Sequence, residues 1–106
     1  WRPFPNNINS SMSYTLKHIY IKPNADIDVN FWSGDILNLI DTYFDAGKIT
    51  QKPVKTTDGS TDTFTTIFKD KASFDEFVAD NISTTNKTAL EVFCDENGVI
   101  CNIETS

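Results

Sequence analysis

The stretch from Leu90 to Thr105, LEVFCDENGVICNIET, decides the fold that the sequence predicts. Asn97-Gly98 near its middle is a strong signal for a two-residue hairpin turn, because both central positions of a type I′ turn need positive φ. Pairing residues outward from this turn places most apolar residues of the stretch on one face, because directly opposed residues on two strands share a face. One face then carries Leu90 opposite Thr105, Val92 opposite Ile103 and Cys94 opposite Cys101.

The other face of this predicted hairpin pairs Glu91 with Glu104 and Phe93 with Asn102. A mostly polar face of this kind is typical of the solvent side of an antiparallel sheet. We therefore predict that the chain ends in a β-hairpin whose apolar side covers the core, with Phe93 turned toward solvent or a partner.

The elements before this hairpin begin with a strand at 13–22, in which Leu16, His18 and Tyr20 share one side. A helix follows from about 33 to 46, because its apolar residues recur at steps of three and four. Gly47 then stands where a left-handed helix cap is favoured.

A second hairpin is predicted around Asp58-Gly59, between strands at 49–57 and 60–69. Two-residue pairing from this turn places Lys55 opposite Asp62 and Ile49 opposite Phe68. Pro53 cannot donate a ladder hydrogen bond, so the first of these strands should be an edge strand, or bulged at that point.

The second helix is predicted to begin at a capping box, Ser73 to Glu76, in which each side chain hydrogen-bonds the other residue's backbone N–H. It should end near Asn81, ahead of a polar loop at 83–88. The order of elements is then βαββαβ, the ferredoxin-like plan, with one extra strand from the closing hairpin. We predict a single α+β domain over 13–106, with two helices on one face of an antiparallel sheet, after an irregular arm at 1–12.

Composition and charge exclude several classes of protein. The net charge of -6 argues against a nucleic-acid partner, because phosphate binding needs clustered Lys and Arg. The sequence has no apolar run long enough to span a membrane, so we expect no membrane partner. Two cysteines do not make a disulfide-dense secreted scaffold, so we expect a reduced, cytoplasmic protein. Asp26, Asp28 and Asn30 have the spacing that opens an EF-hand loop, but Phe31 and Leu37 replace its essential Gly and Glu. We therefore predict no metal and no cofactor.

The two cysteines, Cys94 and Cys101, lack the paired spacing of a zinc or redox motif. As neighbours across the predicted hairpin they are within bridging range, so an oxidising compartment would permit a disulfide. We expect reduced core thiols.

A resemblance to a known family rests on the order of elements over residues 13–94. The strand SYTLKHIYIK, the helix ending in Asp45-Ala46-Gly47, the hairpin strand TFTTIFKD and the helix SFDEFVADN carry it. In these features the chain resembles the dimeric α/β-barrel group of ferredoxin-like proteins, which includes antibiotic-biosynthesis monooxygenases. The resemblance implies a homodimer in which two sheets meet, through the outer face with Phe93 or through the edge strand.

Five residues are candidates for a functional site. His18 is the sole histidine, and an imidazole facing a pocket could act as a base or ligand, although strand histidines are more often structural. Tyr20, Trp32, Tyr43 and Phe68 could line an aromatic pocket between helix and sheet, although aromatics at helical spacing are usually core residues.

Three functions follow from these features. We predict first a non-enzymatic, homo-oligomeric module that binds a protein or a small ligand, because no catalytic set accompanies the fold signals. The alternative is a cofactor-independent monooxygenase or isomerase of the dimeric α/β-barrel type, which a deep enclosed pocket walled by His18 and Trp32 would favour. A third is a phage-encoded inhibitor of a host protein, since Lys outnumbers Arg eight to one, as in many AT-rich genomes.

Overall fold

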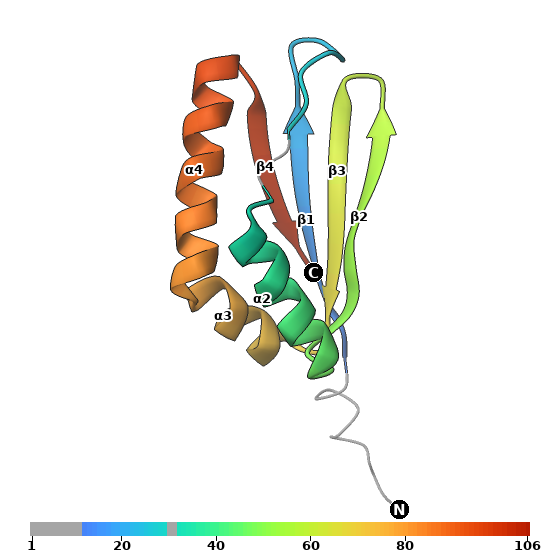
Figure 1. The fold of residues 1–106 in the computed structure, drawn as a ribbon. Coiled ribbons are helices and arrows are strands. Elements are labelled where there is room, and N and C mark those ends of the chain that lie inside the picture. Colours follow the sequence, from blue (N-terminus) through green and yellow to red (C-terminus); the bar gives the residue numbers. More distant parts are fainter. Residues whose placement is uncertain (1–11, 30–31) are drawn as a thin grey trace, which may run out of the picture.

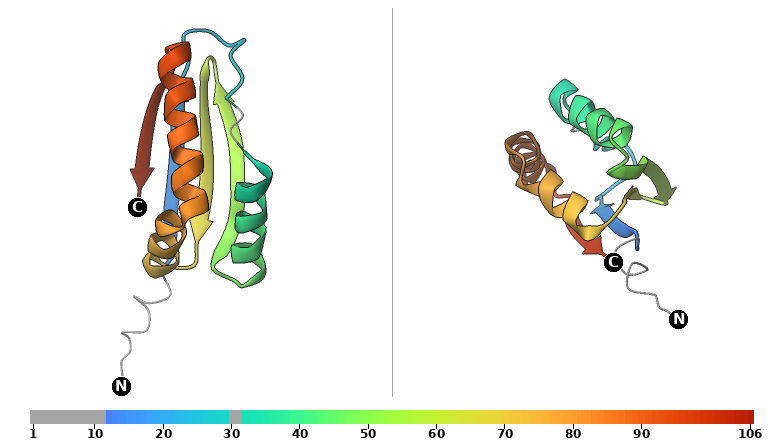
Figure 2. Two further views of the ribbon diagram at one scale, coloured as in Figure 1. Left: turned by 60° about the vertical axis from the view of Figure 1, so that its left-hand side comes forward. Right: turned by 90° about the horizontal axis from the view of Figure 1, so that it is seen from below.

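The computed structural model describes residues 12–29 and 32–106, which form one antiparallel sheet of four strands and three helices (Figure 1). Apart from Met12, the predicted arm at 1–12 lies outside the described residues. The strands stand in the order β2-β3-β1-β4, and the helices all lie on one face of the sheet (Figures 1 and 2). The α+β class and the antiparallel sheet are thus confirmed. In chain order the elements are β1 (Tyr14–Ile21), α2 (Gly34–Asp45), β2 (Ile49–Asp58), β3 (Thr61–Phe68), α3 (Lys71–Ala79), α4 (Asn81–Asn97) and β4 (Ile100–Thr105).

The prediction of a closing β-hairpin is wrong, because residues 81–97 form helix α4. This helix includes residues 83–88, which were predicted to form a polar loop. Gly98 has a φ of 67° and caps this helix, with its backbone N–H donating to the carbonyl of Cys94. Type I′ turns and left-handed helix caps both favour a glycine with positive φ. The sequence therefore predicted the backbone conformation of Gly98 correctly, but placed the residue in a hairpin turn instead of at the end of a helix. The sheet has four strands rather than five because only Ile100–Thr105 joins it.

Strand β4 pairs with β1 instead of with residues 90–97. Cys101 lies opposite Tyr20, and Ile103 lies opposite His18. The predicted pairing of Cys94 with Cys101 is therefore wrong, since Cys94 lies on α4. Phe93 also lies on α4, where it packs against the core, and not on the outer face of the sheet.

The hairpin between β2 and β3 is confirmed, but its register is shifted near the turn. Thr57 lies opposite Asp62, so the prediction that Lys55 faces Asp62 is wrong. The predicted pairing of Ile49 with Phe68 is found, because two register shifts between Ile49 and Val54 absorb the difference. Pro53 lies in the second irregular stretch, on an edge strand, as its missing N–H requires.

The helix caps explain where α2 and α3 begin. The Ser33 hydroxyl accepts from the backbone N–H of Ile36 at 3.2 Å, which starts α2 at Gly34. The capping box at Ser73 is wrong: Asp70 caps α3, with its carboxylate accepting from the N–H of Ser73 at 2.8 Å. Ser73 is therefore buried inside the first turn.

The buried apolar residues form two clusters rather than one. The first gathers around Phe68 at the end of the sheet covered by α2 and α3, and the second gathers around Tyr20 and Leu90 under α4. On the central strand β1, Leu16 belongs to the first cluster and Tyr20 to the second. His18 comes between them on the same side of the strand. The polar middle of the inner sheet face therefore divides the core.

Candidate functional site

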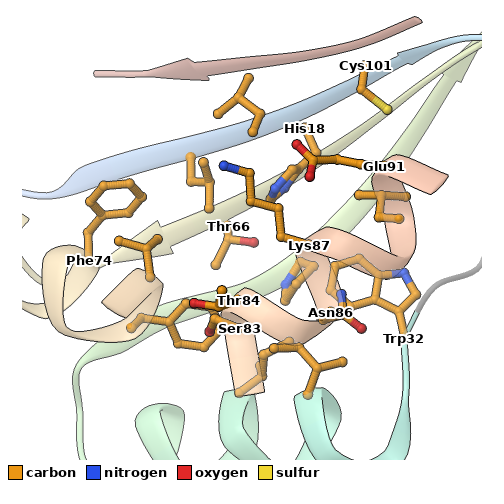
Figure 3. A pocket seen from close by; sticks show the side chains of 18 of the residues that line it. His18, Trp32, Thr66, Phe74, Ser83, Thr84, Asn86, Lys87, Glu91 and Cys101 are labelled. Carbon is orange, nitrogen blue, oxygen red and sulfur yellow. The ribbon is translucent and has the colours of Figure 1, made fainter. Parts of the chain in front are cut away.

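A cavity of about 540 Å³ lies between the inner face of the sheet and the helices, against both apolar clusters. Its size is in the range of pockets that bind small organic molecules. Figure 3 shows most of the side chains that surround it, and the lining residues come from the sheet, from the loop before α2 and from all three helices of the described residues. Four of the five predicted site residues line it: His18, Tyr20, Trp32 and Phe68.

Tyr43 is not among the residues that line this cavity. It is buried on α2, where its ring meets the edge of Phe77 at a centroid distance of 5.2 Å. The structure therefore brings together the predicted residues of the sheet and the pre-helix loop, and places Tyr43 within the first apolar cluster.

His18 forms the polar part of the cavity floor. Its Nδ1 atom is buried and has no hydrogen-bond partner among the described residues. Burial and the nearby Lys87 ammonium both disfavour the imidazolium and hold the pKa of His18 below its usual 6.5. The ring is therefore neutral at pH 7, and it lies parallel to the Tyr20 ring at a centroid distance of 6.2 Å.

The opposite wall comes from α4, whose inward side changes character along the helix. Leu90 and Cys94 are buried in its second half, whereas Ser83 and Asn86 occupy the corresponding inward positions in its first half. The hydroxyl oxygen of Ser83 is buried and, within residues 12–29 and 32–106, it has no hydrogen-bond partner. Ser83 lines the cavity on the side opposite the sheet, while its hydroxyl oxygen is enclosed by neighbouring atoms (Figure 3).

The apolar lining is largely aromatic. Trp32 packs on Phe64 with ring centroids 5.5 Å apart, and it contacts both apolar clusters. Phe68 is fully buried and meets Phe74 in an edge-on contact at 5.5 Å. These rings offer flat faces and edges to a molecule in the cavity, which favours a planar apolar ligand.

The mouth of the cavity lies between α4 and the edge strand β4, where the lining residues are exposed. Lys87 and Glu91 stand one turn apart on α4, and Cys101 and Ile103 stand on β4. The mouth therefore carries one positive and one negative side chain, and both are solvated.

The two cysteines are free thiols, with Cys94 buried and Cys101 on the exposed edge strand. Burial of the sulfur, followed by a hydrogen bond with Cys94, raises the pKa of Cys101 to about 12. The two thiols contact each other between helix α4 and strand β4, and not across the predicted hairpin. A thiol with so high a pKa carries almost no thiolate at pH 7 and is a poor nucleophile.

Metal binding and membrane insertion are two further functions on which the described residues, 12–29 and 32–106, bear. No group of three or more His, Cys, Asp or Glu side chains in that part of the chain is arranged to hold a metal ion. No helix within it has the length and apolar character needed to cross a membrane.

Sequence reasoning missed Thr66, Ser83 and Asn86, the polar residues that complete the cavity wall with His18. Thr66 could have been found, because it lies on the same side of β3 as Phe64 and Phe68. Ser83 lies three residues before Asn86, and Asn86 lies four residues before Leu90. This spacing places the three residues on one side of a helix. Because Ser83 and Asn86 are polar, the spacing of apolar residues did not indicate this side of the helix.

Comparisons of the chain with protein-family models, with curated proteins and with solved structures give no match. The fold and the site therefore define this protein as an α+β domain with a four-stranded antiparallel sheet, three helices and an aromatic cavity between them.

Proposed function

We propose that this protein binds a small, largely apolar organic molecule in the cavity between α4 and the sheet. The observation that supports the proposal is an aromatic cavity of about 540 Å³ whose lining also contains a few polar side chains, among them His18, Thr66 and Asn86. Pockets for small ligands have this composition, in which apolar walls supply affinity and a few polar groups fix orientation.

The energetics of the core favour the same conclusion. A buried polar atom without a hydrogen bond costs about 1 to 3 kcal/mol, and a cavity in a core forfeits contacts that a packed core would make. Apolar residues at 18, 66, 83 and 86 would fill the space and join the two clusters. A ligand that fills the cavity would restore the contacts that the unfilled space forfeits.

Binding of a neutral fluorescent probe tests this proposal. N-phenyl-1-naphthylamine should bind the wild-type protein with saturable fluorescence enhancement, and Thr66→Phe should abolish that binding by filling the cavity. The matched control is Thr65→Phe, since Thr65 is the neighbouring residue on the outer side of the same strand and is absent from the lining. If both variants bind the probe as well as the wild type, the cavity is not the binding site.

A second pair of variants guards against a folding defect at Thr66. Asn86→Phe obstructs the cavity from α4, whereas Thr85→Phe places the same ring on an exposed position one residue away. We expect loss of probe binding for Asn86→Phe and retention for Thr85→Phe. Equal binding by these two variants would also contradict the proposal.

A second candidate function is proton transfer in a cofactor-independent monooxygenase or isomerase, as the family resemblance implies. Its support is the neutral His18, whose side chain lines the cavity and could accept a proton from a bound substrate. His18 and Trp32 both belong to the wall, which is the arrangement that favours this alternative over a protein-binding module. If His18→Ala turns over a substrate as fast as the wild type, this candidate loses its main support.

The ferredoxin-like relationship belongs to the same proposal. Strand β3 lies between β1 and β2, and β1 lies between β3 and β4, so each strand-helix-strand unit is split by another strand. This alternation is the feature that the ferredoxin-like plan requires. The connection through two helices, α3 and α4, is the departure from it.

A homodimer stays a prediction, and the outer face of the sheet is its best candidate. No described helix covers that face (Figure 2). By register it presents Ile19 and Ile21 beside a row of threonines on β3, and Lys17 is its one charged residue on the two central strands. A nearly neutral face on a chain with a net charge of -6 suits contact with a second copy. Inhibition of a host protein likewise stays a prediction.

A further inference from the structure

We infer that the outer edge of strand β4 is a docking site for an extended peptide segment of a partner protein, which adds to the sheet as a fifth strand and turns a Lys or Arg toward helix α4. The inference goes beyond the proposed function, because the site is the strand edge and not the cavity. It rests on the backbone groups that β4 directs away from the sheet, on the contrast between the two edges of the sheet and on the carboxylates beside β4.

The hydrogen-bond pattern of β4 shows which of its backbone groups point outward. Thr15 and Ser106 exchange backbone hydrogen bonds in both directions, at 2.8 and 3.0 Å. Because bonded pairs alternate along an antiparallel ladder, residues 100, 102 and 104 also bond to β1. The N–H and C=O groups of Cys101, Ile103 and Thr105 therefore point away from the sheet. No other described strand lies on that side of β4 (Figure 1).

The two edges of the sheet differ in how they are protected against pairing with another chain. Strand β2, at one edge, contains Pro53, two register shifts and the exposed Lys52 and Lys55, which are all devices that prevent strand addition. Strand β4, ICNIET, contains no Pro and no Lys, pairs with β1 without a register shift, and is exposed at all six residues. It is therefore the edge that is open to a new strand.

Strand addition at β4 would also bring side chains of the peptide to helix α4. Cys101 and Ile103 lie opposite Tyr20 and His18 and line the mouth of the cavity on the inner side of the sheet. Residues of an added strand directly opposite them share that side. In this mode of recognition the backbone hydrogen bonds supply affinity, and the alternate side chains supply specificity.

The carboxylates beside this edge favour a basic residue on the inner side of the peptide. After burial and the neighbouring thiol, the charges of Asp95 and Glu91 also raise the pKa of Cys101, so both carboxylates lie near that end of β4. Both side chains are exposed, and neither belongs to an ion pair within residues 12–29 and 32–106. The Lys87 ammonium lies near His18, toward the other end of the strand. A Lys or Arg opposite Cys101 therefore meets negative charge.

The fluorescein-labelled peptide KVKVKVK tests the inference by fluorescence anisotropy with the full chain at low ionic strength. We expect saturable binding, and weaker or no binding of EVEVEVE. With the lysines on the inner side, opposite Cys101, Ile103 and Thr105, their backbone N–H groups face β4 and those of the valines face solvent. Methylation of the lysine backbone nitrogens should weaken binding about tenfold or more, whereas methylation of the valine nitrogens should leave it within about threefold.

Variants locate the peptide on the protein. Ile103→Pro removes the central outward N–H and should abolish binding, and an edge strand accepts Pro where its N–H faces solvent. Ile103→Thr keeps that N–H and should retain binding. The methylated peptides test the same hydrogen bonds on the wild-type protein, so the result does not depend on the folding of Ile103→Pro.

A second set of variants tests the charges. Glu91→Gln with Asp95→Asn should weaken binding of KVKVKVK about two- to fivefold at low ionic strength. Asp58→Asn with Glu96→Gln changes the net charge equally at exposed positions away from Cys101, and should leave the affinity unchanged.

Three results would overturn the inference. The first is an anisotropy that does not change with KVKVKVK, and the second is equal binding of the two methylated peptides or a greater loss for the valine form. The third is a dimer of the wild-type protein alone in sedimentation that Ile103→Pro converts to a monomer, because a second copy would then occupy the edge. Failure of N-phenyl-1-naphthylamine to bind, with KVKVKVK bound, would count against the proposed function alone.

Discussion

The Lys22 ammonium lies 2.9 Å from the carboxylate of Asp62, and the two side chains are only 5% and 1% exposed. Lys22 also donates to the backbone carbonyl of Ile27 at 2.8 Å, and Thr57 donates to Asp62 at 2.9 Å. This buried ion pair therefore fastens the loop after β1 to the hairpin of β2 and β3. The loop leads on to Val29 and Trp32, so the pair also holds one wall of the cavity.

Removing one partner of this ion pair should destabilise the protein strongly. Asp62→Asn leaves the Lys22 charge buried without its counterion, which costs about 3 to 5 kcal/mol in comparable pairs. Chemical denaturation measures the loss. Asp58→Asn, an exposed carboxylate in the same hairpin, is the control and should change stability by less than about 0.5 kcal/mol. Similar effects of the two variants would show that the pair is not buried as described.

Replacing both charges should cost less than replacing either one. Lys22→Met with Asp62→Leu removes the desolvation penalty of both ions, and buried pairs are often exchanged in this way with little loss. A double variant less stable than Asp62→Asn would contradict this account of the pair.

The stability of the protein should depend on pH through His18. Its pKa is lowered in the folded state, so below pH 6.5 the unfolded chain binds a proton that the folded protein does not. The contribution of His18 to stability is therefore complete above pH 6.5 and is lost as the pH falls toward the folded-state pKa. Unfolding free energies at pH 7.5 and pH 5.5 should differ more for the wild type than for His18→Phe. Identical pH dependence in the two proteins would show that His18 is not buried as the structure describes.

The sequence predicted the first four strand and helix positions because their local signals agree with their surroundings. Leu16, His18 and Tyr20 share one side of β1, and Gly47 ends α2 with a φ of 77°. At Gly98 the local signal was ambiguous, because a type I′ turn and a left-handed helix cap need the same backbone conformation. Only the preceding residues could decide between a strand and a helix.

Those preceding residues misled the prediction because several of them are polar. An inward helical stripe is recognised by its apolar residues, and in the first half of α4 the inward residues are Ser83 and Asn86. They are polar because they face a cavity rather than a packed core. The polar residues Ser83 and Asn86, which line the candidate site, are therefore also the residues that made this helix difficult to predict from the sequence.

A proline substitution distinguishes the helix from the predicted loop. Thr85 lies in the interior of α4 on its exposed side, so Thr85→Pro removes a helical hydrogen bond and should cost about 3 kcal/mol. Thr85→Ala, which favours a helix, should be neutral or slightly stabilising. If Thr85→Pro is as stable as the wild type in thermal unfolding, residues 83–88 form a loop.

The thiols should react slowly in spite of the exposed position of Cys101. Burial of its sulfur and its contact with Cys94 raise its pKa to about 12, so almost no thiolate forms at pH 8. Ellman's reagent should label the folded protein far more slowly than the denatured chain. Cys94→Ala removes the hydrogen-bond partner and should accelerate labelling of Cys101. Rapid labelling of the wild-type protein would contradict the described placement of the thiols.

The most direct test of the central claim is a methyl NMR titration with a neutral aromatic ligand such as 2-naphthol. Two pairs of neighbouring residues on opposite sides of their elements report on its position: Thr66 with Thr65, and Leu90 with Val92. If the ligand occupies the cavity, the methyl signals of Thr66 and Leu90 will shift together along one saturable curve, while those of Thr65 and Val92 stay in place. Shifts confined to Thr65 and Val92, or no shift in any of the four, would contradict the claim that this cavity is the binding site.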